Sequence, residues 1–355
     1  MEGRRNSVRV VVWTALTVVA LAACTTSPSG GSGSGTGGPG QRAVDPRLTD
    51  PALPTEVIFT HIAQAAGGTV RNKLAVVLHG TSANPQAHTE LSNALSGDGY
   101  HVATVRYNAV LSVTGGCPDV TQDDDPDCHQ DLRAETAFGQ DVADPEGAAR
   151  NHPLLNITRT NSAVNRTLKL VNYLAATYPA EGWGQFLQRN AGGVCTSFSS
   201  AYGTCNLDWS KVVLVGHSQG ASVALYLSSF YPVDRVGMLS GAYDAWDNGD
   251  GTLTTASWVV ARKSKIPVAR VTDFVHTRDV GIARIRAVER TLGLPGTETN
   301  VLTSARPWGF SHRLITTITP SCPLDASQVH NATAQDLCAP DGQFVPVWRY
   351  VAGGA

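Results

Sequence analysis

The sequence predicts an α/β fold in which helices cover both faces of a mainly parallel sheet. Apolar runs rich in β-branched residues alternate with helix-like segments along most of the chain, as in folds built from strand–helix–strand units. Two of these runs, residues 73–80 and 211–216, are almost continuously apolar, as strands buried on both faces are. Polar or glycine-rich segments that contain cysteine interrupt the alternation. We therefore expect an α/β domain with disulfide-containing loop insertions.

The individual elements follow from these patterns in chain order. The expected strands are residues 56–62, 73–80, 99–108, 211–216, 235–243, 266–277 and 312–320. The expected helices are residues 85–98, 158–179, 219–232 and 279–294. In the second helix, Val164 and Leu168 recur at helical spacing, and Pro179 ends the pattern. Thr160 or Asn161 can cap its start. The first two strands are close enough to form an antiparallel hairpin. The expected irregular insertions are residues 109–155, 181–208 and 244–265.

The first 23 residues have the features of an export signal. Three arginines near the start precede an apolar run that is too short to span a bilayer comfortably as a permanent helix. The run ends in Leu21-Ala22-Ala23-Cys24. This ending resembles the bacterial lipobox, whose cysteine is acylated and becomes the mature N-terminus. A plain secretory signal followed by a chance cysteine is the alternative.

A flexible tether is expected after this signal. Residues 25–41 consist mostly of glycine and serine, and such a segment cannot pack into a core. We expect a signal peptide at residues 1–23, a lipidated Cys24 with its tether over residues 24–50, and a single α/β domain over residues 51–355. This arrangement predicts a lipid anchor on the extracytoplasmic side of the cell membrane, or secretion if the signal is a plain one.

The composition narrows the possible partners. Charged residues make up 16% of the chain, and the net charge is −2. The sequence contains no arginine-rich run, so nucleic-acid binding is not expected. The hydrophobic content of 42% is sufficient for a large core.

Six cysteines remain when Cys24 is set aside, and they form three pairs of near neighbours in sequence. The pairs are Cys117 with Cys128, Cys195 with Cys205, and Cys322 with Cys338. In an oxidising compartment we expect each pair to form a disulfide that closes a short loop. Only Cys128 has a histidine beside it, and the sequence has no CxxC motif, so a metal site is not expected.

Residues 216–220, Gly-His-Ser-Gln-Gly, stand between an apolar run and a helix-like segment. A serine hydroxyl is a weak nucleophile until a base takes its proton, and it must also be exposed. In the pattern G-x-S-x-G, the glycines permit the sharp strand-to-helix turn that exposes the serine. A turn without chemistry is the alternative. With this motif and with its element order over residues 55–352, the chain resembles the α/β-hydrolase superfamily. The resemblance implies that Ser218 is the nucleophile.

The resemblance also implies an oxyanion hole made by two backbone N–H groups. Gln219, directly after the serine, would supply the first. The second would come from the loop after an earlier strand, where His79-Gly80 ends an apolar run. Either Thr81 or Ser82 would be the donor in that loop.

The triad acid should follow Ser218 at the end of a strand. Asp279 is the first candidate because it comes shortly after the run 266–277 and opens a helix. Asp244 follows the preceding strand and is the alternative. Asp273 lies in the middle of a strand and is expected to point into the sheet. An unrelated carboxylate that caps a helix is the non-catalytic interpretation of Asp279.

The triad histidine should come last in the chain. His330 follows the last strand, where the superfamily keeps its catalytic histidine, in a loop that a disulfide would restrain. His312 is the alternative, but it begins that strand, at the wrong end of a parallel sheet, and His276 comes too early. We therefore expect the His330 ring to lie at or near hydrogen-bond distance from the Ser218 hydroxyl, with Asp279 orienting it.

Together these features predict a serine hydrolase that cleaves a carboxylic ester through an acyl-enzyme. The substrate would be a small molecule or an ester of a lipid or polysaccharide. No metal or organic cofactor is expected, and the protein is expected to be a monomer. Thioesterase, amidase and peptidase activities use the same machinery and remain alternatives. A non-catalytic binding protein of the cell envelope on a hydrolase fold is a further alternative.

Overall fold

The computed structural model describes residues 40–53, 59–262, 264–320, 326–336, 338–339 and 342–353. The chain divides into two units, Met1–Thr36 and Gly37–Ala355. The predicted signal peptide and Cys24 lie outside the described residues. Within the described ranges, no helix is both long enough and apolar enough to cross a bilayer.

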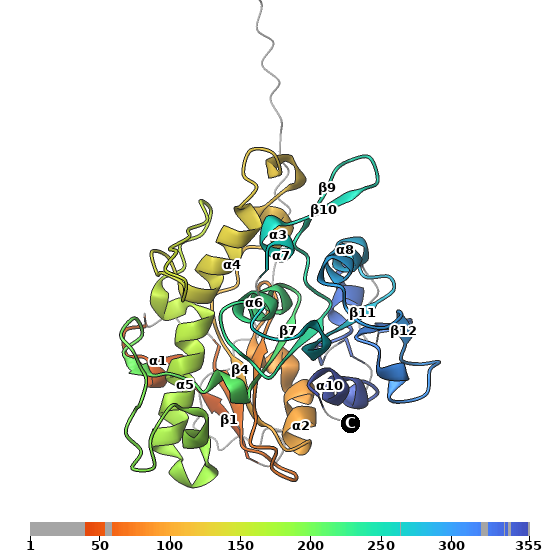
Figure 1. Cartoon of the computed structure of the whole chain (residues 1–355). Helices are drawn as coiled ribbons and strands as arrows, with labels where there is room; N and C mark the ends of the chain where they lie inside the picture. The colour runs from red at the N-terminus through yellow and green to blue at the C-terminus, as the bar shows by residue number, and fades with distance from the viewer. Residues whose placement is uncertain are drawn as a thin grey trace, which may run out of the picture. The chain divides into compact units, whose positions relative to one another are not determined.

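A nine-stranded sheet forms the centre of the second unit (Figure 1). Its strands are β1 (Gln41–Val44), β2 (His61–Gln64), β3 (Leu74–Leu78), β4 (His101–Val105), β7 (Val212–His217), β8 (Arg235–Leu239), β11 (Val271–His276), β12 (Thr299–Asn300) and β13 (Arg313–Thr316). Their order across the sheet is β1-β2-β4-β3-β7-β8-β11-β13-β12. Every neighbouring pair from β4 to β12 is parallel, whereas β2 is antiparallel to both β1 and β4. The prediction of a mainly parallel sheet is confirmed.

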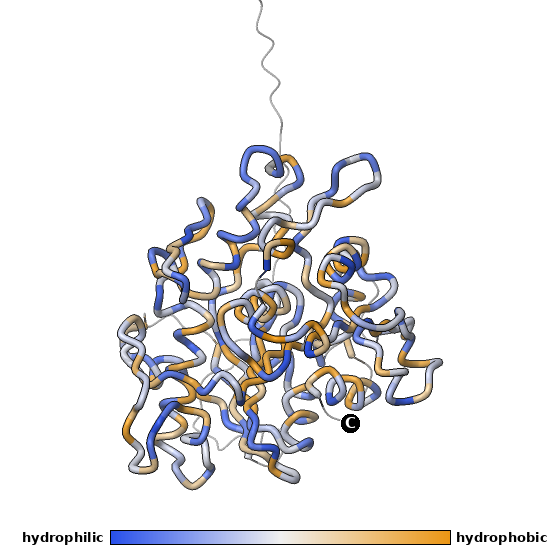
Figure 2. Tube along the Cα trace, in the orientation of Figure 1, coloured by the Kyte–Doolittle hydropathy of each residue, from blue (hydrophilic) through white to orange (hydrophobic). Residues whose placement is uncertain are grey.

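The central strands are buried on both faces. In β3, Leu74, Val76 and Leu78 belong to one hydrophobic cluster, and Ala75 and Val77 belong to another. Successive side chains of a strand point to opposite faces of the sheet, so burial of both faces requires a continuous apolar run. Figure 2 shows hydrophobic residues gathered along these central strands.

Helices cover both faces of the sheet (Figure 1). The longer ones are α2 (Thr89–Gly97), α4 (Cys128–Phe138), α5 (Ala163–Thr177), α6 (Gln219–Leu227), α8 (Ile282–Leu292), α9 (Ala326–Asn331) and α10 (Val345–Val351). Side chains of α2 and α10 join the hydrophobic cluster that contains Val77. Side chains of α4, α5 and α6 join the cluster that contains Val76. Different sets of helices thus cover the two faces of the sheet.

The N-terminal part of this unit differs from the prediction in two respects. Residues 41–44 form β1, which pairs with β2, and α1 (Pro46–Thr49) follows, so the tether predicted to reach residue 50 extends too far. These residues are not glycine or serine, and four residues are enough to add an edge strand. The predicted hairpin between residues 56–62 and 73–80 is wrong, because β4 lies between β2 and β3 in the sheet.

The segment 109–155 is partly helical rather than irregular. It contains α4, an eleven-residue helix whose buried residues include Arg133, Glu135 and Thr136. Because several of its buried positions are polar, the segment lacks the apolar periodicity from which a helix is predicted. The start of α5 also differs, because the Ser162 side chain accepts a hydrogen bond from the Asn165 N–H and caps the helix.

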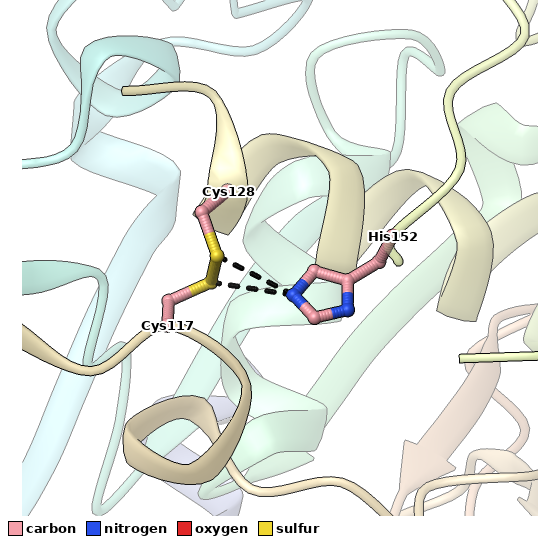
Figure 3. Close-up of side chains that lie close together, drawn as sticks. All are labelled: Cys117, Cys128 and His152. Carbon is pink, nitrogen blue, oxygen red and sulfur yellow. Dashed lines mark hydrogen bonds between the residues drawn. A yellow bond between two sulfur atoms is a disulfide. The ribbon is translucent and has the colours of Figure 1, made fainter. Parts of the chain in front are cut away.

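Two of the three predicted disulfides are present. Cys117 bonds to Cys128 and Cys195 bonds to Cys205, with Cα–Cα distances of 5.8 and 5.5 Å. The third predicted pair includes Cys322, which lies outside the described residues. Figure 3 shows His152 beside the first disulfide, with its Nε2 3.3 Å from Cys128 Sγ and 3.7 Å from Cys117 Sγ. Both sulfur atoms are joined in the disulfide, so this group offers no thiolate to a metal ion.

Candidate active site

Ser218 occupies a one-residue turn between a strand and a helix. Strand β7 ends at His217, and α6 begins at Gln219. The backbone of Ser218 has φ 55° and ψ −120°, a conformation that non-glycine residues rarely adopt. Such a strained turn is the local geometry that the G-x-S-x-G motif predicts, and it presents the serine at the carboxyl end of a central strand.

The glycines of the motif are required by packing. A Cβ atom added at Gly216 would lie 2.1 Å from the Gly220 carbonyl oxygen, and one added at Gly220 would lie 2.1 Å from the Leu78 carbonyl oxygen. A Cβ at Gly80 would lie 2.9 Å from Ser218 Cβ. The strand–turn–helix unit and the loop after β3 are therefore in direct backbone contact, which only glycine allows.

Two backbone N–H groups next to Ser218 are candidates for an oxyanion hole. Gln219 is the first residue of α6, so its N–H has no intrahelical acceptor. The Ser82 N–H donates to the Ala109 carbonyl oxygen at 2.8 Å and is therefore engaged. The Thr81 N–H donates to no backbone carbonyl of the described residues, which leaves it as the second candidate. The Thr81 hydroxyl donates to Gln219 Oε1 at 2.9 Å and ties the two loops together.

Asp279 follows β11 and carries a buried carboxylate. Its Oδ2 accepts a hydrogen bond from His330 Nδ1 at 2.8 Å. Its Oδ1 accepts from the Gly281 N–H and from the Tyr243 hydroxyl, each at 2.8 Å. Burial acts to raise the pKa of Asp279, but the hydrogen bonds and the charge of His330 outweigh it, and the pKa lies below its usual value. Asp279 is thus held as an acceptor for the imidazole.

His330 lies in α9, after the last strand of the sheet. Because its Nδ1 bonds to Asp279, its Nε2 is the nitrogen left for a substrate or a serine. His330 and Ser218 line the same cavity, which has a volume of about 240 Å³. No hydrogen bond joins Ser218 to His330 among the described residues, so a contact at or near 2.6–3.2 Å stays a prediction. Catalytic hydrogen bonds are often longer in unliganded sites than in substrate complexes.

The structure separates Asp244 from this group. Its carboxylate accepts hydrogen bonds from Arg133 Nε at 2.8 Å, from Arg133 Nη2 at 3.2 Å and from Trp258 Nε1 at 3.3 Å. Ser222 of α6 also donates to it. The carboxylate is fully buried and committed to these partners, so the alternative role as triad acid is not supported by its position.

The other rejected candidates do not line the cavity that contains Ser218 and His330. Asp273 is fully buried within β11, and burial together with the adjacent Glu289 raises its pKa well above the usual value. His312 Nδ1 lies within hydrogen-bond distance of Val271 O and Thr272 Oγ1, at the amino end of β11. His276 Nε2 lies 2.7 Å from the Ile318 carbonyl oxygen.

Three further histidines near the site are buried and neutral. Burial lowers the pKa of His79 to about 3 and that of His88 to about 4. Burial also lowers the pKa of His217 well below its usual value. These rings add no positive charge beside Ser218 near neutral pH. Unlike these three histidines, His330 is hydrogen-bonded to a carboxylate, that of Asp279.

Hydrogen bonds join the segment after His330 to the start of α2. The Asp336 carboxylate accepts hydrogen bonds from the Thr89 N–H at 2.8 Å and the Glu90 N–H at 3.0 Å. The His88 ring donates to the Ala334 carbonyl oxygen through Nδ1 at 2.9 Å. Burial raises the pKa of Asp336 to about 7 despite its backbone hydrogen bonds. These contacts, like the Tyr243 contact with Asp279, have no local signal in the sequence.

Comparisons with known proteins identify no family. The chain matches no protein-family model, and no curated protein matches it. Solved structures with a similar arrangement include esterase 2 of Thermogutta terrifontis, at 10% identity and a TM-score of 0.34 over 79% of this chain and 82% of that one. The esterase Est22 aligns at 12% identity and a TM-score of 0.37 over 83% and 76% of the two chains. The acetyl xylan esterase of Aspergillus awamori aligns at 13% identity and a TM-score of 0.32 over 73% and 88%. At these identities and TM-scores the alignments assign no role to this chain, so its function is inferred from the geometry of Ser218, Asp279 and His330.

Proposed function

We propose that this protein is a serine hydrolase that cleaves carboxylic esters through an acyl-enzyme on Ser218. In the proposed reaction, Ser218 Oγ attacks the carbonyl carbon while His330 Nε2 takes its proton. His330 then gives that proton to the departing alcohol, and water releases the acid by the same steps. The N–H groups of Gln219 and Thr81 would donate to the oxyanion. Asp279 would hold His330 in the tautomer whose Nε2 can accept a proton.

One observation carries this proposal: three segments far apart in the sequence bring a strained serine, a carboxylate-bound histidine and two candidate N–H donors to one cavity. A strained φ/ψ pair persists only where the surroundings enforce it, and such strain gathers at functional sites. A protein that only binds a ligand has no need of a carboxylate that orients a histidine beside a serine. The arrangement therefore favours catalysis over binding alone.

The cavity favours a short acyl group. Its volume of about 240 Å³ lies below the range of about 300–1,000 Å³ that is usual for pockets enclosing drug-sized ligands. Polar side chains outnumber aliphatic ones along its lining, and Val113 and Val280 are its aliphatic residues. A long alkyl chain would have to leave the cavity and cross the open surface.

With p-nitrophenyl esters we expect the highest kcat/KM for acetyl to butyryl chains and a loss of at least about tenfold for chains of ten carbons. Ser218→Ala should abolish turnover of every ester in the series. Ser229→Ala is the matched control, because Ser229 lies just beyond the far end of α6 and its hydroxyl has no hydrogen-bond partner among the described residues. A maximum at long chains would overturn the short-acyl proposal, and turnover that survives Ser218→Ala would overturn the serine mechanism.

We also propose that the mature protein is held at the extracytoplasmic face of the membrane by acylation of Cys24. The lipobox-like sequence and the glycine- and serine-rich segment after it support this proposal. In a bacterial host the wild-type chain is expected in the membrane fraction, and Cys24→Ala is expected to leave that fraction. Wild-type protein recovered mainly from the medium would instead support a plain secretory signal.

A further inference from the structure

Tyr243 lies where it contacts two members of the proposed triad at once. Its hydroxyl is 2.8 Å from Asp279 Oδ1 and 3.2 Å from His330 Nδ1. The His330 Nδ1 atom is itself 2.8 Å from Asp279 Oδ2. The two carboxylate oxygens, the imidazole nitrogen and the phenol oxygen therefore form one closed set of contacts. The Tyr243 and His330 rings meet edge to face, with centroids 5.4 Å apart and planes at 88°.

The phenol can act only as a donor toward Asp279. Burial, followed by the charge of Asp279, raises the pKa of Tyr243 far above its usual value, so its proton stays in place. Asp279 is ionised and accepts, because its pKa lies below the usual value. Tyr243 thus fixes the oxygen of Asp279 that does not face His330, and the carboxylate plane cannot rotate away from the imidazole.

The position of the Tyr243 ring is itself enforced by a neighbour. A Cβ atom at Gly281 would lie 1.9 Å from the Cε1 and Cζ atoms of that ring. Gly281 has φ −99°, which any residue can adopt, so close packing by the tyrosine is what demands glycine there. The Gly281 N–H also donates to Asp279 Oδ1. The loop after β8 and the loop after β11 therefore pack directly against each other at this point.

The charged groups around this set are few. The charge of Arg284 of α8 acts on Tyr243, and this arginine is bound to Asp119 and to the Ala245 carbonyl oxygen. His217 lies against His330, with ring centroids 5.1 Å apart, and is neutral because it is buried. Asp279 is the ionised group in direct contact with the His330 ring, and Tyr243 competes with that ring for the Asp279 charge.

We propose that Tyr243 is a positioning residue of the triad, which holds the Asp279 carboxylate in the plane of the His330 ring and shares its charge. This proposal rests on the proposed hydrolase function. Removing the phenol hydroxyl leaves Asp279 with one donor fewer and more freedom to rotate. The general base is then less well aligned, and the full carboxylate charge acts on the imidazolium.

Tyr243→Phe is expected to lower kcat by about 10- to 100-fold with a change in KM of less than about threefold, because the misalignment affects the transition state more than substrate binding. The acid limb of the pH–rate profile should move to higher pH. Tyr350→Phe is the matched control, since it also removes one phenol hydrogen bond, donated to the Ser311 carbonyl oxygen at 3.0 Å, away from Ser218. Gly281→Ala should displace the tyrosine ring and lower kcat in the same direction.

A readout that needs no turnover separates this proposal from the hydrolase proposal. An NMR titration of the His330 ring in the full-length protein should show a higher midpoint in Tyr243→Phe than in wild type, with no change in Tyr350→Phe. An unchanged midpoint together with a kcat within about twofold of wild type would overturn the positioning role. If the wild type hydrolyses no ester, the hydrolase proposal fails, and the NMR midpoint alone still supports or overturns the role of Tyr243.

Discussion

Asp279→Asn is expected to reduce kcat about 10,000-fold, with the fold intact. An asparagine can keep the shape of the site, but its amide cannot stabilise the imidazolium and allows the wrong tautomer of His330. The hydrogen bond at 2.8 Å between His330 Nδ1 and Asp279 Oδ2 is the contact that the substitution changes. The loss should be measured as kcat for the best short-chain ester.

The control for this prediction is a carboxylate that lies beside the sheet but outside the site. Glu298 pairs with Arg286 at 2.6 Å on the surface, so Glu298→Gln should leave kcat unchanged. A loss of less than about tenfold in Asp279→Asn would contradict the assignment of Asp279 as the triad acid.

Asp244→Ala is expected to lower the free energy of unfolding by about 3–5 kcal/mol. The side chains of Asp244 and Arg133 are both fully buried, and two nitrogen atoms of the guanidinium donate to the carboxylate. Removal of the acid leaves a positive charge in the core without a partner, and the hydroxyl of Ser222 loses its acceptor. Urea unfolding of the two proteins gives the difference directly.

The same Glu298→Gln variant serves as the reference for stability. Its ion pair with Arg286 is partly exposed, with side chains 34% and 27% accessible, so its loss should cost under about 1 kcal/mol. If Asp244→Ala lowers the free energy of unfolding no more than Glu298→Gln does, then the pair of Asp244 and Arg133 does not stabilise the packing of α4 against the loop after β8. Asp244→Ala is also expected to lose activity only in proportion to unfolding, unlike Asp279→Asn.

The parts of the site that the sequence predicts are those set by local geometry or by chain order. The G-x-S-x-G motif predicts the turn at Ser218, because the serine and the two glycines that permit the turn lie within five consecutive residues. Asp279 and His330 could be proposed because each follows a strand, and the carboxyl ends of parallel strands meet at one edge of a sheet. In the structure, His330 lines one cavity with Ser218, and Asp279 is hydrogen-bonded to His330.

The parts that the sequence does not predict depend on contacts between distant segments. Tyr243 and Asp244 are adjacent in the chain, yet Tyr243 contacts Asp279 and His330 while Asp244 is held by Arg133. No pattern in the neighbouring sequence shows that Tyr243, and not Asp244, contacts Asp279 and His330. The helix α4 was missed for a related reason, since its buried Arg133 and Glu135 resemble an exposed surface when read in sequence. Polar residues that are satisfied in the core leave no hydrophobic periodicity.

The most direct test of the central claim is reaction of the purified protein with a fluorophosphonate probe, followed by mass spectrometry of the peptides. We expect one phosphonyl group per chain, attached to Ser218, and none on folded Ser218→Ala protein. Ser229→Ala should be labelled like the wild type. A folded wild-type protein that remains unlabelled would favour the non-catalytic alternative, and a probe attached to another residue would contradict the assignment of Ser218 as the nucleophile.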